Sequence, residues 1–484
     1  MSRRIRWSVV LAAALVAAAS SSAQPRSPLE IGAVTPELLD RNLVDRTISL
    51  LEGANLGDAV RVTVTWDKGQ KALDPSLLDD LKYGIDRAQA AGADVYLTVY
   101  PKGSADTPLT VADQTTFSRF AASLARAMPE VRHMIIGNEP NLNRFWLPQF
   151  TAGGADAAAP AYERLLARTY DALKAASPRV EVIGGALAHR GADIPGTGRD
   201  THSPAAFILD LGKTYRASGR RKPIMDALAY HPYLERSSLP PSFQHLMSTT
   251  LTIADYGKLV SLLRRAFDGT GQLGSTLPIV YSEFGVESRI PPSAQSLYTG
   301  TEPATTGPVT EEVQARYYAQ AMQLAACQPT VRTFLVFRLI DSPTLPDWQS
   351  GIYYADRQTP KSNRAAIAAA AQRARTPTPT GCARLLAPRP LLSFFPIRPP
   401  TKRFPTLKPA LLLCNEDCDY ELRLYRLRDN ALLAAVVGES VAGSAVHVRL
   451  PAFPLPRGSY RLTARVTAVA YFANAFTAKR DFGL

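Results

Sequence analysis

Two glutamates stand at the ends of short apolar runs, an arrangement that could form a pair of catalytic carboxylates. Glu139 closes the run Met134–Glu139, and Glu283 closes the run Pro278–Glu283. In (β/α)8 barrels the active site is built at the carboxyl ends of the strands, so two such residues can face each other across the barrel mouth. A facing pair can supply the acid and the nucleophile of glycoside cleavage, with retention at about 5–5.5 Å separation and inversion at about 6.5–9.5 Å.

Polar residues on neighbouring runs could support such a pair. Asn138 directly precedes the first glutamate, Arg61 lies in a third apolar run, and a fourth run ends at His231 and continues to Tyr233. A positive neighbour lowers the pKa of a carboxyl group, so Arg61 could hold one glutamate ionised. A charge on the strand surface is the alternative for Arg61, and a structural role beside a turn proline is the alternative for His231.

Tryptophan is rare in the chain, and its placement is informative. Apart from Trp7 there are three, Trp66, Trp146 and Trp348, and each ends or follows a predicted strand on the side of the glutamates. The C–H faces of sugars pack on aromatic rings, so we predict that these side chains line a sugar site. Core packing is the alternative, expected for about one of the three.

Two charged residues near the predicted strand ends receive other interpretations. Glu287 lies beyond Gly285, where the chain leaves the strand, and is predicted to be a solvated loop carboxylate. His189 ends another apolar run beside Arg190, and a sugar subsite and a structural role are equally open. No histidine and carboxylate cluster has metal-ligand spacing and no Gly-x-Ser-x-Gly motif is present, so we predict neither a metal, nor another cofactor, nor a serine hydrolase.

The elements that would position these residues follow from an alternation of apolar and amphipathic segments between residues 29 and 372. The predicted strands are Leu29–Val34, Ala59–Trp66, Ala93–Tyr100, Val131–Gly137, Val180–Leu187, Ile224–His231, Pro278–Phe284 and Val331–Leu339. The predicted helices are Pro75–Ala91, Ala112–Met128, Ala161–Ala176, Ile253–Phe267 and Thr310–Ala326. This alternation predicts a (β/α)8 TIM barrel in the α/β class. An open doubly wound sheet is the alternative, but no Gly-x-Gly-x-x-Gly motif follows the first strand.

In this strand map the sequence resembles the clan A glycoside hydrolases, whose signature is Asn-Glu-Pro on the fourth strand and a nucleophilic Glu on the seventh. The matching residues are Asn138-Glu139-Pro140 and Glu283, and the resemblance covers roughly residues 29–372. It implies a retaining double displacement with Glu139 as general acid/base and Glu283 as nucleophile. It also implies that Asn138 binds the sugar 2-hydroxyl next to the nucleophile.

Further positions match the clan in part. His231 and Tyr233 match its His-x-Tyr, which implies that Tyr233 hydrogen-bonds the nucleophile and that His231 lines the site. Arg61 resembles the Arg that holds the nucleophile ionised in cellulase-like members. Two strands depart from the family 5 pattern: the third ends in Thr98–Pro101 without a His, and the eighth runs through Phe334–Leu339 without a Trp. An endoglucanase is therefore not implied, and family 5 and family 39 are equally open.

We therefore predict a glycosidase that hydrolyses O-glycosidic bonds of an oligo- or polysaccharide by double displacement, without a cofactor. A transglycosylase would share every catalytic residue, and a catalytically inactive carbohydrate-binding barrel is a further alternative. Release of reducing sugar, transfer to an acceptor sugar, or the absence of both products would distinguish these three functions.

The N-terminus predicts export. Three arginines among the first six residues precede the apolar run Trp7–Ala19 and small residues up to Ala23, the pattern of a secretory signal peptide. The run is too short to span a bilayer comfortably, so cleavage near Ala23 is favoured over a membrane anchor. We expect residues 1–23 to be a signal peptide and the mature protein to be secreted or held at the cell surface, with no membrane span.

The composition of the 484-residue chain is that of a globular protein, with 46% hydrophobic and 20% charged residues. The formal net charge of +13 is spread diffusely. No basic run is interleaved with aromatic residues, so nucleic acid is not a predicted partner. The expected partner is a saccharide, and we expect a monomer.

The composition changes after Arg375. Nine prolines, six lysines or arginines and no acidic residue fall between residues 377 and 409. This predicts a linker without regular elements over 375–409, between a catalytic domain over 24–374 and a module over 410–484. The predicted strands of the module are Tyr420–Leu427, Leu432–Val437, Val446–Leu450 and Ser459–Val466. They predict an antiparallel, immunoglobulin-like β-sandwich. A passive spacer is favoured over a sugar-binding module because this segment contains no Trp.

Four cysteines fit an exported protein, and the sequence alone allows three pairings. The simplest joins Cys414 to Cys418 within one short polar loop and Cys327 to Cys382 at the end of the large domain. A zinc site is the alternative, but it lacks Cys-x-x-Cys spacing and nearby histidines. The acidic residues of the Cys414–Cys418 loop are predicted to serve the turn.

Overall fold

The structure is a computed structural model, and it describes most of the chain after the N-terminal segment. The described residues are 28–245, 248–376, 379–386, 391–393, 396–397, 406–407, 410–450, 455–469 and 475–483. The predicted signal peptide, residues 1–23, lies outside them. Among the described residues, no helix combines the length and the apolar character that crossing a bilayer requires.

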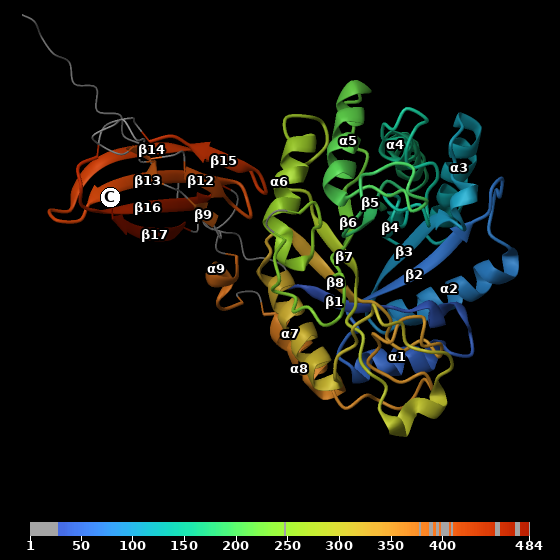
Figure 1. Cartoon of the computed structure of the whole chain (residues 1–484). Helices are drawn as coiled ribbons and strands as arrows, with labels where there is room; N and C mark the ends of the chain where they lie inside the picture. Colours follow the sequence, from blue (N-terminus) through green and yellow to red (C-terminus); the bar gives the residue numbers. More distant parts are fainter. Residues whose placement is uncertain are drawn as a thin grey trace, which may run out of the picture.

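The larger part of the chain forms a closed barrel of eight parallel strands (Figure 1). The strands are β1 (Glu30–Val34), β2 (Ala59–Trp66), β3 (Asp94–Pro101), β4 (His133–Ile136), β5 (Glu181–Ala188), β6 (Ala227–His231), β7 (Ile279–Phe284) and β8 (Val331–Val336). Strand β1 pairs with both β2 and β8, which closes the barrel and excludes the open sheet. The predicted (β/α)8 barrel is confirmed.

Helices alternate with the strands and surround the barrel in Figure 1. They are α1 (Val44–Gly53), α2 (Pro75–Ala90), α3 (Val111–Ala127), α4 (Ala158–Ala176), α5 (Pro204–Ala217), α6 (Tyr256–Phe267), α7 (Glu311–Cys327) and α8 (Arg364–Ala374). The first turn of α2 is stabilised by residues that favour a helix start. Asp74 accepts hydrogen bonds from the backbone N–H groups of Ser76 and Leu77, and Pro75 occupies the first turn. Helices α1, α5 and α8 were not predicted; α8 is largely alanine, which gives weak hydrophobic periodicity.

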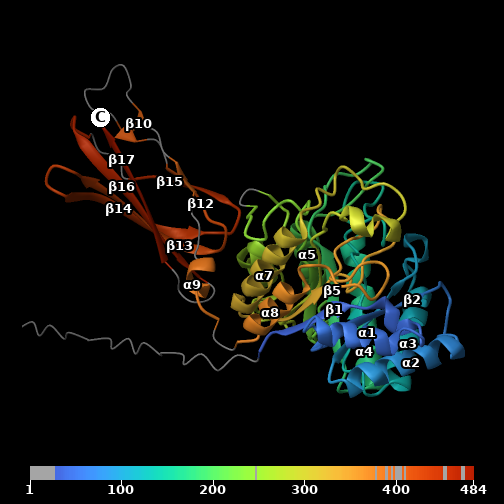
Figure 2. The same cartoon turned by 90° about the horizontal axis from the view of Figure 1, so that it is seen from below.

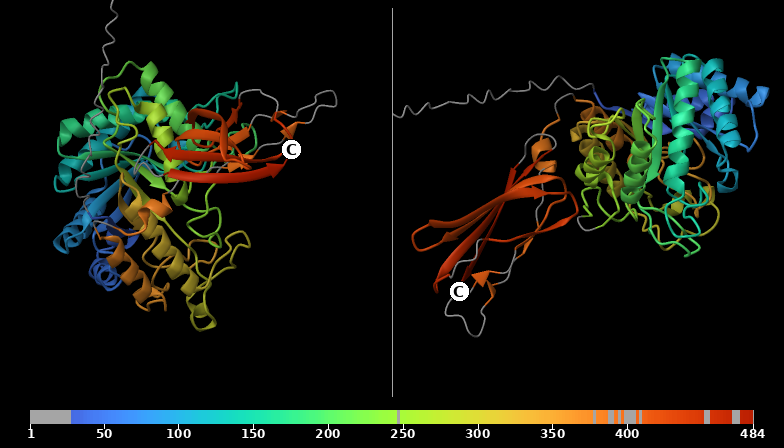
Figure 3. Two further views of the ribbon diagram at one scale, coloured as in Figure 1. Left: turned by 90° about the vertical axis from the view of Figure 1, so that its left-hand side faces the viewer. Right: turned by 90° about the horizontal axis from the view of Figure 1, so that it is seen from above.

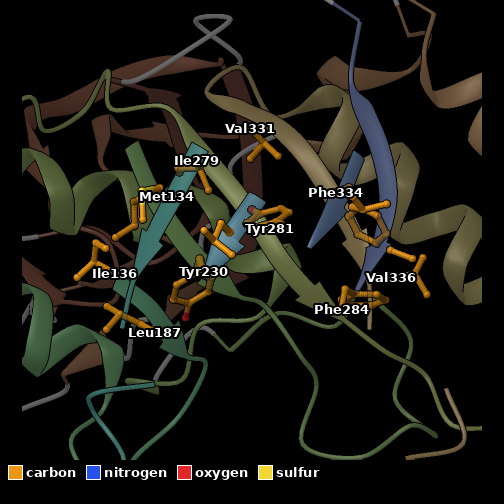
Figure 4. Close-up of a cluster of buried hydrophobic side chains, with 14 of the residues drawn as sticks. Met134, Ile136, Leu187, Tyr230, Ile279, Tyr281, Phe284, Val331, Phe334 and Val336 are labelled. Carbon is orange, nitrogen blue, oxygen red and sulfur yellow. The ribbon is translucent and has the colours of Figure 1, made fainter. Parts of the chain in front are cut away.

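The core has two layers because successive side chains of a strand point to opposite faces. On β4, Met134 and Ile136 pack outward against the helices, whereas Ile135 points into the barrel. On β7, Tyr281 packs outward and Val280 inward. Figure 4 shows the outer layer, with side chains of β4, β7 and β8 in one cluster. These two layers fill the barrel and leave its carboxyl end for the site.

The C-terminal part folds as two antiparallel sheets packed face to face, so the predicted sandwich is confirmed. One sheet has the order β14-β13-β16-β17 and the other β15-β12-β9. The strands are β9 (Leu391–Ser393), β12 (Ala410–Leu413), β13 (Cys418–Arg426), β14 (Ala431–Ser440), β15 (Ala445–Val448), β16 (Ser459–Ala468) and β17 (Ala475–Gly483). Figures 2 and 3 show the sandwich as a separate body beside the barrel.

The prediction that residues 375–409 form no regular element is wrong. The segment contains the short helix α9 (Cys382–Leu385), strand β9, and the paired strands β10 (Pro396–Ile397) and β11 (Thr406–Leu407). Strand β9 pairs with β12, with Leu392 opposite Leu412. The prolines flank β9 instead of interrupting it, so its backbone N–H groups are free to join the sheet.

One of the two predicted disulfides is present. Cys327, the last residue of α7, is bonded to Cys382, the first residue of α9. The predicted bond between Cys414 and Cys418 is wrong, because both are buried free thiols. The thiol of Cys418 lies 3.2 Å from the carbonyl oxygen of Glu416, to which it donates a hydrogen bond. Its interaction with Cys414 and its burial raise the pKa of Cys418.

The Cys414–Cys418 loop also joins the sandwich to the barrel, a role that the prediction of a simple turn missed. Asp417 accepts a hydrogen bond from Ser261 of α6 at 2.6 Å and forms an ion pair with Arg264 of the same helix. A Cβ atom at Gly257 would lie 2.6 Å from the Cβ of Glu416, so the absence of a side chain permits this close approach. Asp417 is therefore a docking residue.

Replacing Asp417 by Ala is expected to lower the free energy of unfolding by about 1–3 kcal/mol, because a buried acceptor of several hydrogen bonds is lost. Urea titration of the full chain measures this change. The control is Asp481→Ala, which removes an exposed ion pair with Arg461 within the sandwich. That pair is exposed to solvent and is expected to contribute little to the free energy of unfolding. Equal losses in the two variants would contradict the docking role of Asp417.

Candidate active site

The two predicted glutamates both line a cavity of about 990 Å³ at the carboxyl ends of the barrel strands. An adjoining hollow of about 700 Å³ shares several lining residues with this cavity, among them Trp348. The cavity is large enough for a saccharide of more than one ring. The site therefore lies where the barrel fold positions chemistry.

The turn after β4 aims Glu139 into the cavity. Gly137 has φ +102° and Glu139 has φ +42°, and the backbone N–H of Glu139 donates to the carbonyl of Ala186 at 2.8 Å. A Cβ atom at Gly137 would come 2.9 Å from the ring of Tyr162, so this position requires glycine in both conformation and space. A left-handed backbone at a non-glycine residue is strained, and such strain gathers at functional sites.

An irregularity in β7 aims Glu283. The register against β8 shifts between Tyr281 and Phe284, and both of these residues pack in the outer layer although three positions separate them. Strict alternation of side chains would not place both on one face. The bulge absorbs the difference, and Glu283 turns toward the cavity.

The two carboxylates and His231 form one compact group. One side-chain oxygen from each glutamate and one ring nitrogen of His231 all lie within 4.8 Å of one another. Nδ1 of His231 is 2.9 Å from Oε1 of Glu139 and 3.5 Å from Oε2 of Glu283. The histidine is fully buried and is not among the residues that line the cavity, so it reaches the site through its contacts with the two acids.

Arg61 is the centre of the hydrogen bonds that hold Glu283. Its Nη1 forms an ion pair with Glu283, its Nη2 donates to Oδ1 of Asn138 at 3.0 Å, and its Nε donates to Oγ1 of Thr98 at 2.7 Å. Only 2% of Arg61 is exposed, so the alternative of a surface charge is wrong. Tyr233 donates to Oε2 of Glu283 at 3.0 Å, the contact that the resemblance implied.

These neighbours favour the ionised form of Glu283. Burial raises the pKa of this carboxyl group, but the charges of His231 and Arg61, together with the hydrogen bonds from Arg61 and Tyr233, outweigh burial and lower the pKa below its ordinary value. Glu139 accepts its hydrogen bond from His231 and has no arginine as a direct partner among the described residues. The two carboxyl groups therefore have unlike environments.

The comparisons with known proteins concern the fold. No family model and no curated protein matches the sequence. The structure is similar to a family 39 glycoside hydrolase from the gut symbiont Bacteroides cellulosilyticus WH2, with 15% identity, a TM-score of 0.51, and coverage of 86% of this chain and 80% of that chain. The chain therefore shares the (β/α)8 barrel fold of that glycoside hydrolase.

Two other solved structures are similar at lower scores. One is GH5_18 from Streptomyces cattleya in complex with GlcNAc, at 16% identity and TM-score 0.47, covering 73% of this chain and 82% of that chain. The other is a monomeric β-xylosidase from Caulobacter crescentus CB15, at 13% identity and TM-score 0.46, covering 87% of this chain and 94% of that chain. At these identities the likeness concerns the fold alone, so the site is argued from its own geometry.

Of the three predicted sugar-binding tryptophans, only Trp348 lines the cavity, where its ring centroid lies 5.1 Å from that of Tyr233. The prediction is wrong for Trp66 and Trp146, which are 0% and 1% exposed. Trp66 packs edge-on against Phe117, and Trp146 packs edge-on against a tyrosine of α4. Both side chains point into the layer between strands and helices. A position near a strand end does not reveal in which direction the side chain points.

Two other predictions concern His189 and Glu287. His189 lines the cavity but is buried, so a sugar subsite and a structural role both stay predictions, and burial and the nearby Arg190 lower its pKa to about 3. The prediction of a solvated Glu287 is wrong, because this side chain is only 8% exposed. Burial raises the pKa of Glu287 to about 8, and its carboxylate lies 3.4 Å from the backbone N–H of Gln349.

Sequence reasoning missed several cavity residues. Tyr100 and Phe337 line the cavity at the ends of β3 and β8, the two strands that depart from the family 5 pattern. Because both residues lie at the carboxyl ends of predicted strands, the sequence could have indicated that they line the cavity. Phe145 and Arg144 come from the loop after β4, and Arg338 follows β8 with φ +67°. These three loop residues carried no signal in the sequence, because barrel closure decides which loops converge.

The group formed by Glu139, His231 and Glu283 is also close enough to bind a metal ion. However, Glu283 already pairs with Arg61 and accepts a hydrogen bond from Tyr233. The guanidinium of Arg61 would repel a cation at this position. The donor set therefore fits a carboxylate pair acting on an organic substrate better than it fits a metal centre.

Proposed function

We propose that the protein is an exported, retaining glycoside hydrolase that cleaves O-glycosidic bonds of an oligo- or polysaccharide. The observation that carries the proposal is the pair of carboxylates within 4.8 Å in a cavity at the barrel mouth, one of them ion-paired with Arg61. This limit on the distance between one oxygen of each carboxylate supports the roughly 5–5.5 Å separation of retaining enzymes over the roughly 6.5–9.5 Å of inverting ones. The barrel fold shared with a family 39 glycoside hydrolase, the sequence resemblance to clan A and the export pattern of residues 1–23 support the proposal.

The reaction follows from the unlike environments of the two acids. Glu283, kept ionised, attacks the anomeric carbon and forms a glycosyl ester, while Glu139 donates its proton to the departing glycosidic oxygen. Glu139 then takes a proton from water, and the resulting attack on the anomeric carbon releases the sugar and regenerates Glu283. Two inversions give net retention. No further group is required for the balance of atoms and charge.

The proposal is tested with the purified mature chain on a panel of aryl glycosides and polysaccharides. Release of reducing sugar that is absent from the Glu283→Gln variant is the expected result. Proton NMR of the first product should show the anomeric configuration of the substrate, and an inverted first product would contradict double displacement. Transfer to an added acceptor in preference to water would assign a transglycosylase. Binding without either product would assign an inactive barrel.

The role of Arg61 predicts a change in pH dependence. Glu283 must be ionised to attack, so activity is lost as the pH falls through its pKa. Replacing Arg61 by Gln removes a charge that lowers this pKa, and the acidic limb of the kcat/KM profile should move to higher pH. Turnover at the optimum should fall about 100-fold, as for other losses of a preorganised charge.

The matched variant for this measurement is Arg61→Lys, which keeps the charge but loses the forked hydrogen bonds to Asn138 and Thr98. It should lower turnover and leave the acidic limb close to its original pH. An unchanged acidic limb in Arg61→Gln, with the fold intact by circular dichroism, would show that Arg61 does not set the ionisation of Glu283.

A further inference from the structure

The walls of the catalytic cavity carry more positive charge than the chemistry of the carboxylate pair uses. Besides Arg61, the cavity is lined by Arg144, Arg190, Arg199 and Arg338. They come from the loops after β4, β5 and β8, so only the closed barrel brings them together. None of these four forms an ion pair with another described residue.

The other carboxylates of the same cavity form no ion pair with these arginines among the described residues. Outside the catalytic pair, the acidic residues of the cavity are Glu235 and Asp347. Glu235 pairs with His245 at 2.7 Å, and Asp347 accepts hydrogen bonds from the hydroxyls of Ser342 and Thr344 at 3.1 and 3.2 Å. An excess of guanidinium groups without ionic partners therefore faces the space that a substrate fills.

The adjoining hollow continues this charge. It is lined by Arg190 and Arg199 again and, in addition, by Arg236. Its acidic residues are Glu235 and Asp347, which also line the catalytic cavity, and Glu287, whose pKa is raised to about 8 by burial. The positive surface thus extends from the catalytic cavity past Trp348, which lines both spaces.

Arg338 is the most constrained of these residues. It follows β8 in a left-handed conformation with φ +67°, and its Nε is buried without a hydrogen-bond partner among the described residues. The nearby acid is Glu37, whose pKa is raised by burial, and no hydrogen bond joins the two among the described residues. A strained backbone and an unsatisfied donor each destabilise the free protein, and a ligand that accepts the hydrogen bond of Arg338 would offset part of this cost.

Aromatic rings lie beside these charges. Phe337, next to Arg338, has its ring centroid 5.3 Å from that of Trp348. Aromatic rings bind the C–H face of a sugar, and a guanidinium binds a carboxylate or sulfate through two parallel hydrogen bonds. The cavity therefore combines a surface for a sugar ring with a surface for an anionic substituent.

We infer that the substrate of this site is an anionic saccharide, whose carboxylate or sulfate groups bind Arg338 and the arginines at the cavity rim. The inference rests on the proposed function, because the cavity that it concerns is the proposed active site. Positive walls around a cleft also raise the rate at which an anionic ligand arrives, and this effect weakens with salt. Binding should accordingly weaken as ionic strength rises.

The test measures binding separately from turnover. The full-length mature Glu283→Gln variant is titrated by calorimetry with oligosaccharides from polygalacturonate, alginate, hyaluronan and chondroitin sulfate, each beside its carboxyl-reduced or desulfated counterpart. At least one anionic probe should bind about tenfold or more tightly than its neutral counterpart, the ratio expected for one charge-assisted contact. The carboxyl-reduced and desulfated counterparts distinguish uronate from sulfate recognition.

Variants assign the binding to the named arginines. Arg338→Gln, and Arg190→Gln combined with Arg199→Gln, should each reduce affinity for the anionic probe about tenfold and leave the neutral probe within about threefold. Arg338→Lys should lose less, because it keeps the charge. The control for Arg338→Gln is Arg126→Gln on α3, an exposed residue away from the cavity, which lowers the net charge by the same one unit and should leave binding unchanged.

Several outcomes would overturn the inference. These are equal affinity for every anionic and neutral pair, no binding of any anionic probe, or equal losses in Arg126→Gln and the cavity variants. Hydrolysis of a neutral glycoside with no preference for its uronide would reject the anionic substrate but leave the proposed hydrolase standing. Specific binding of an anionic probe with no turnover in the unmutated chain would reject the proposed hydrolase but support the anionic ligand.

Discussion

Replacing Glu283 by Gln is expected to lower kcat by about four orders of magnitude or more, as loss of a nucleophile does in other covalent enzymes. The carboxylate that forms the glycosyl ester is gone, and an amide oxygen cannot replace it. The amide keeps the size of the side chain and can still accept from Tyr233, which is 3.0 Å away in the native protein. Thermal unfolding should therefore change little, and steady-state kinetics on an active aryl glycoside measures the loss.

Chemical rescue makes this prediction specific. In Glu283→Gly, azide should occupy the space of the missing carboxylate and attack the anomeric carbon, giving a glycosyl azide of inverted configuration. The control is Glu130→Gln, an exposed carboxylate before β4 and outside the cavity, which should retain normal turnover. Near-normal turnover in Glu283→Gln would reject the nucleophile assignment.

Replacing Glu139 by Gln is expected to give the second-largest effect, a loss of about 10²–10⁴ in turnover on substrates with poor leaving groups. The variant cannot protonate the glycosidic oxygen. With a dinitrophenyl leaving group, which needs no proton, glycosylation should be nearly normal and the glycosyl ester should accumulate, because the base that activates water is also missing. A burst of dinitrophenolate in stopped-flow measurements would reveal this intermediate.

Added azide should then accelerate turnover of Glu139→Gln and give a glycosyl azide of retained configuration, the opposite of the product from Glu283→Gly. The two stereochemical outcomes assign the two roles independently. Equal sensitivity of Glu139→Gln to good and poor leaving groups would show that Glu139 is not the acid. Exchange of the two azide configurations would reverse the assignments of Glu139 and Glu283.

Much of the fold and the catalytic pair could be predicted from the sequence. Parallel strands that are buried on both faces read as continuous apolar runs, so the eight strands were recognisable with small errors at their ends. Because parallel strands of a barrel end at one face, a carboxylate at the end of the fourth and another at the end of the seventh must share a mouth. Glu139 and Glu283 were predictable for that reason alone.

Side-chain direction was not predictable to the same degree. Trp66 is the last residue of β2, but it points into the layer between strands and helices. The bulge between Tyr281 and Phe284 also has no sequence signature that separates it from a regular strand. A single inserted residue reverses which face of the strand a side chain occupies. The sequence therefore showed which residues lie near the barrel mouth, but not which of their side chains point into the cavity.

The sequence by itself determined the barrel, the sandwich and the place of the two acids, because these follow from local hydrophobic patterns and from the shared end of parallel strands. Only the tertiary structure decided the rest. In the folded chain Cys414 and Cys418 are free thiols, and Asp417 contacts α6. Glu287 is buried, and Arg190 and Arg338 line one cavity. Apart from the two thiols, which lie four residues apart, these features join residues distant in the chain, and no local pattern encodes such contacts.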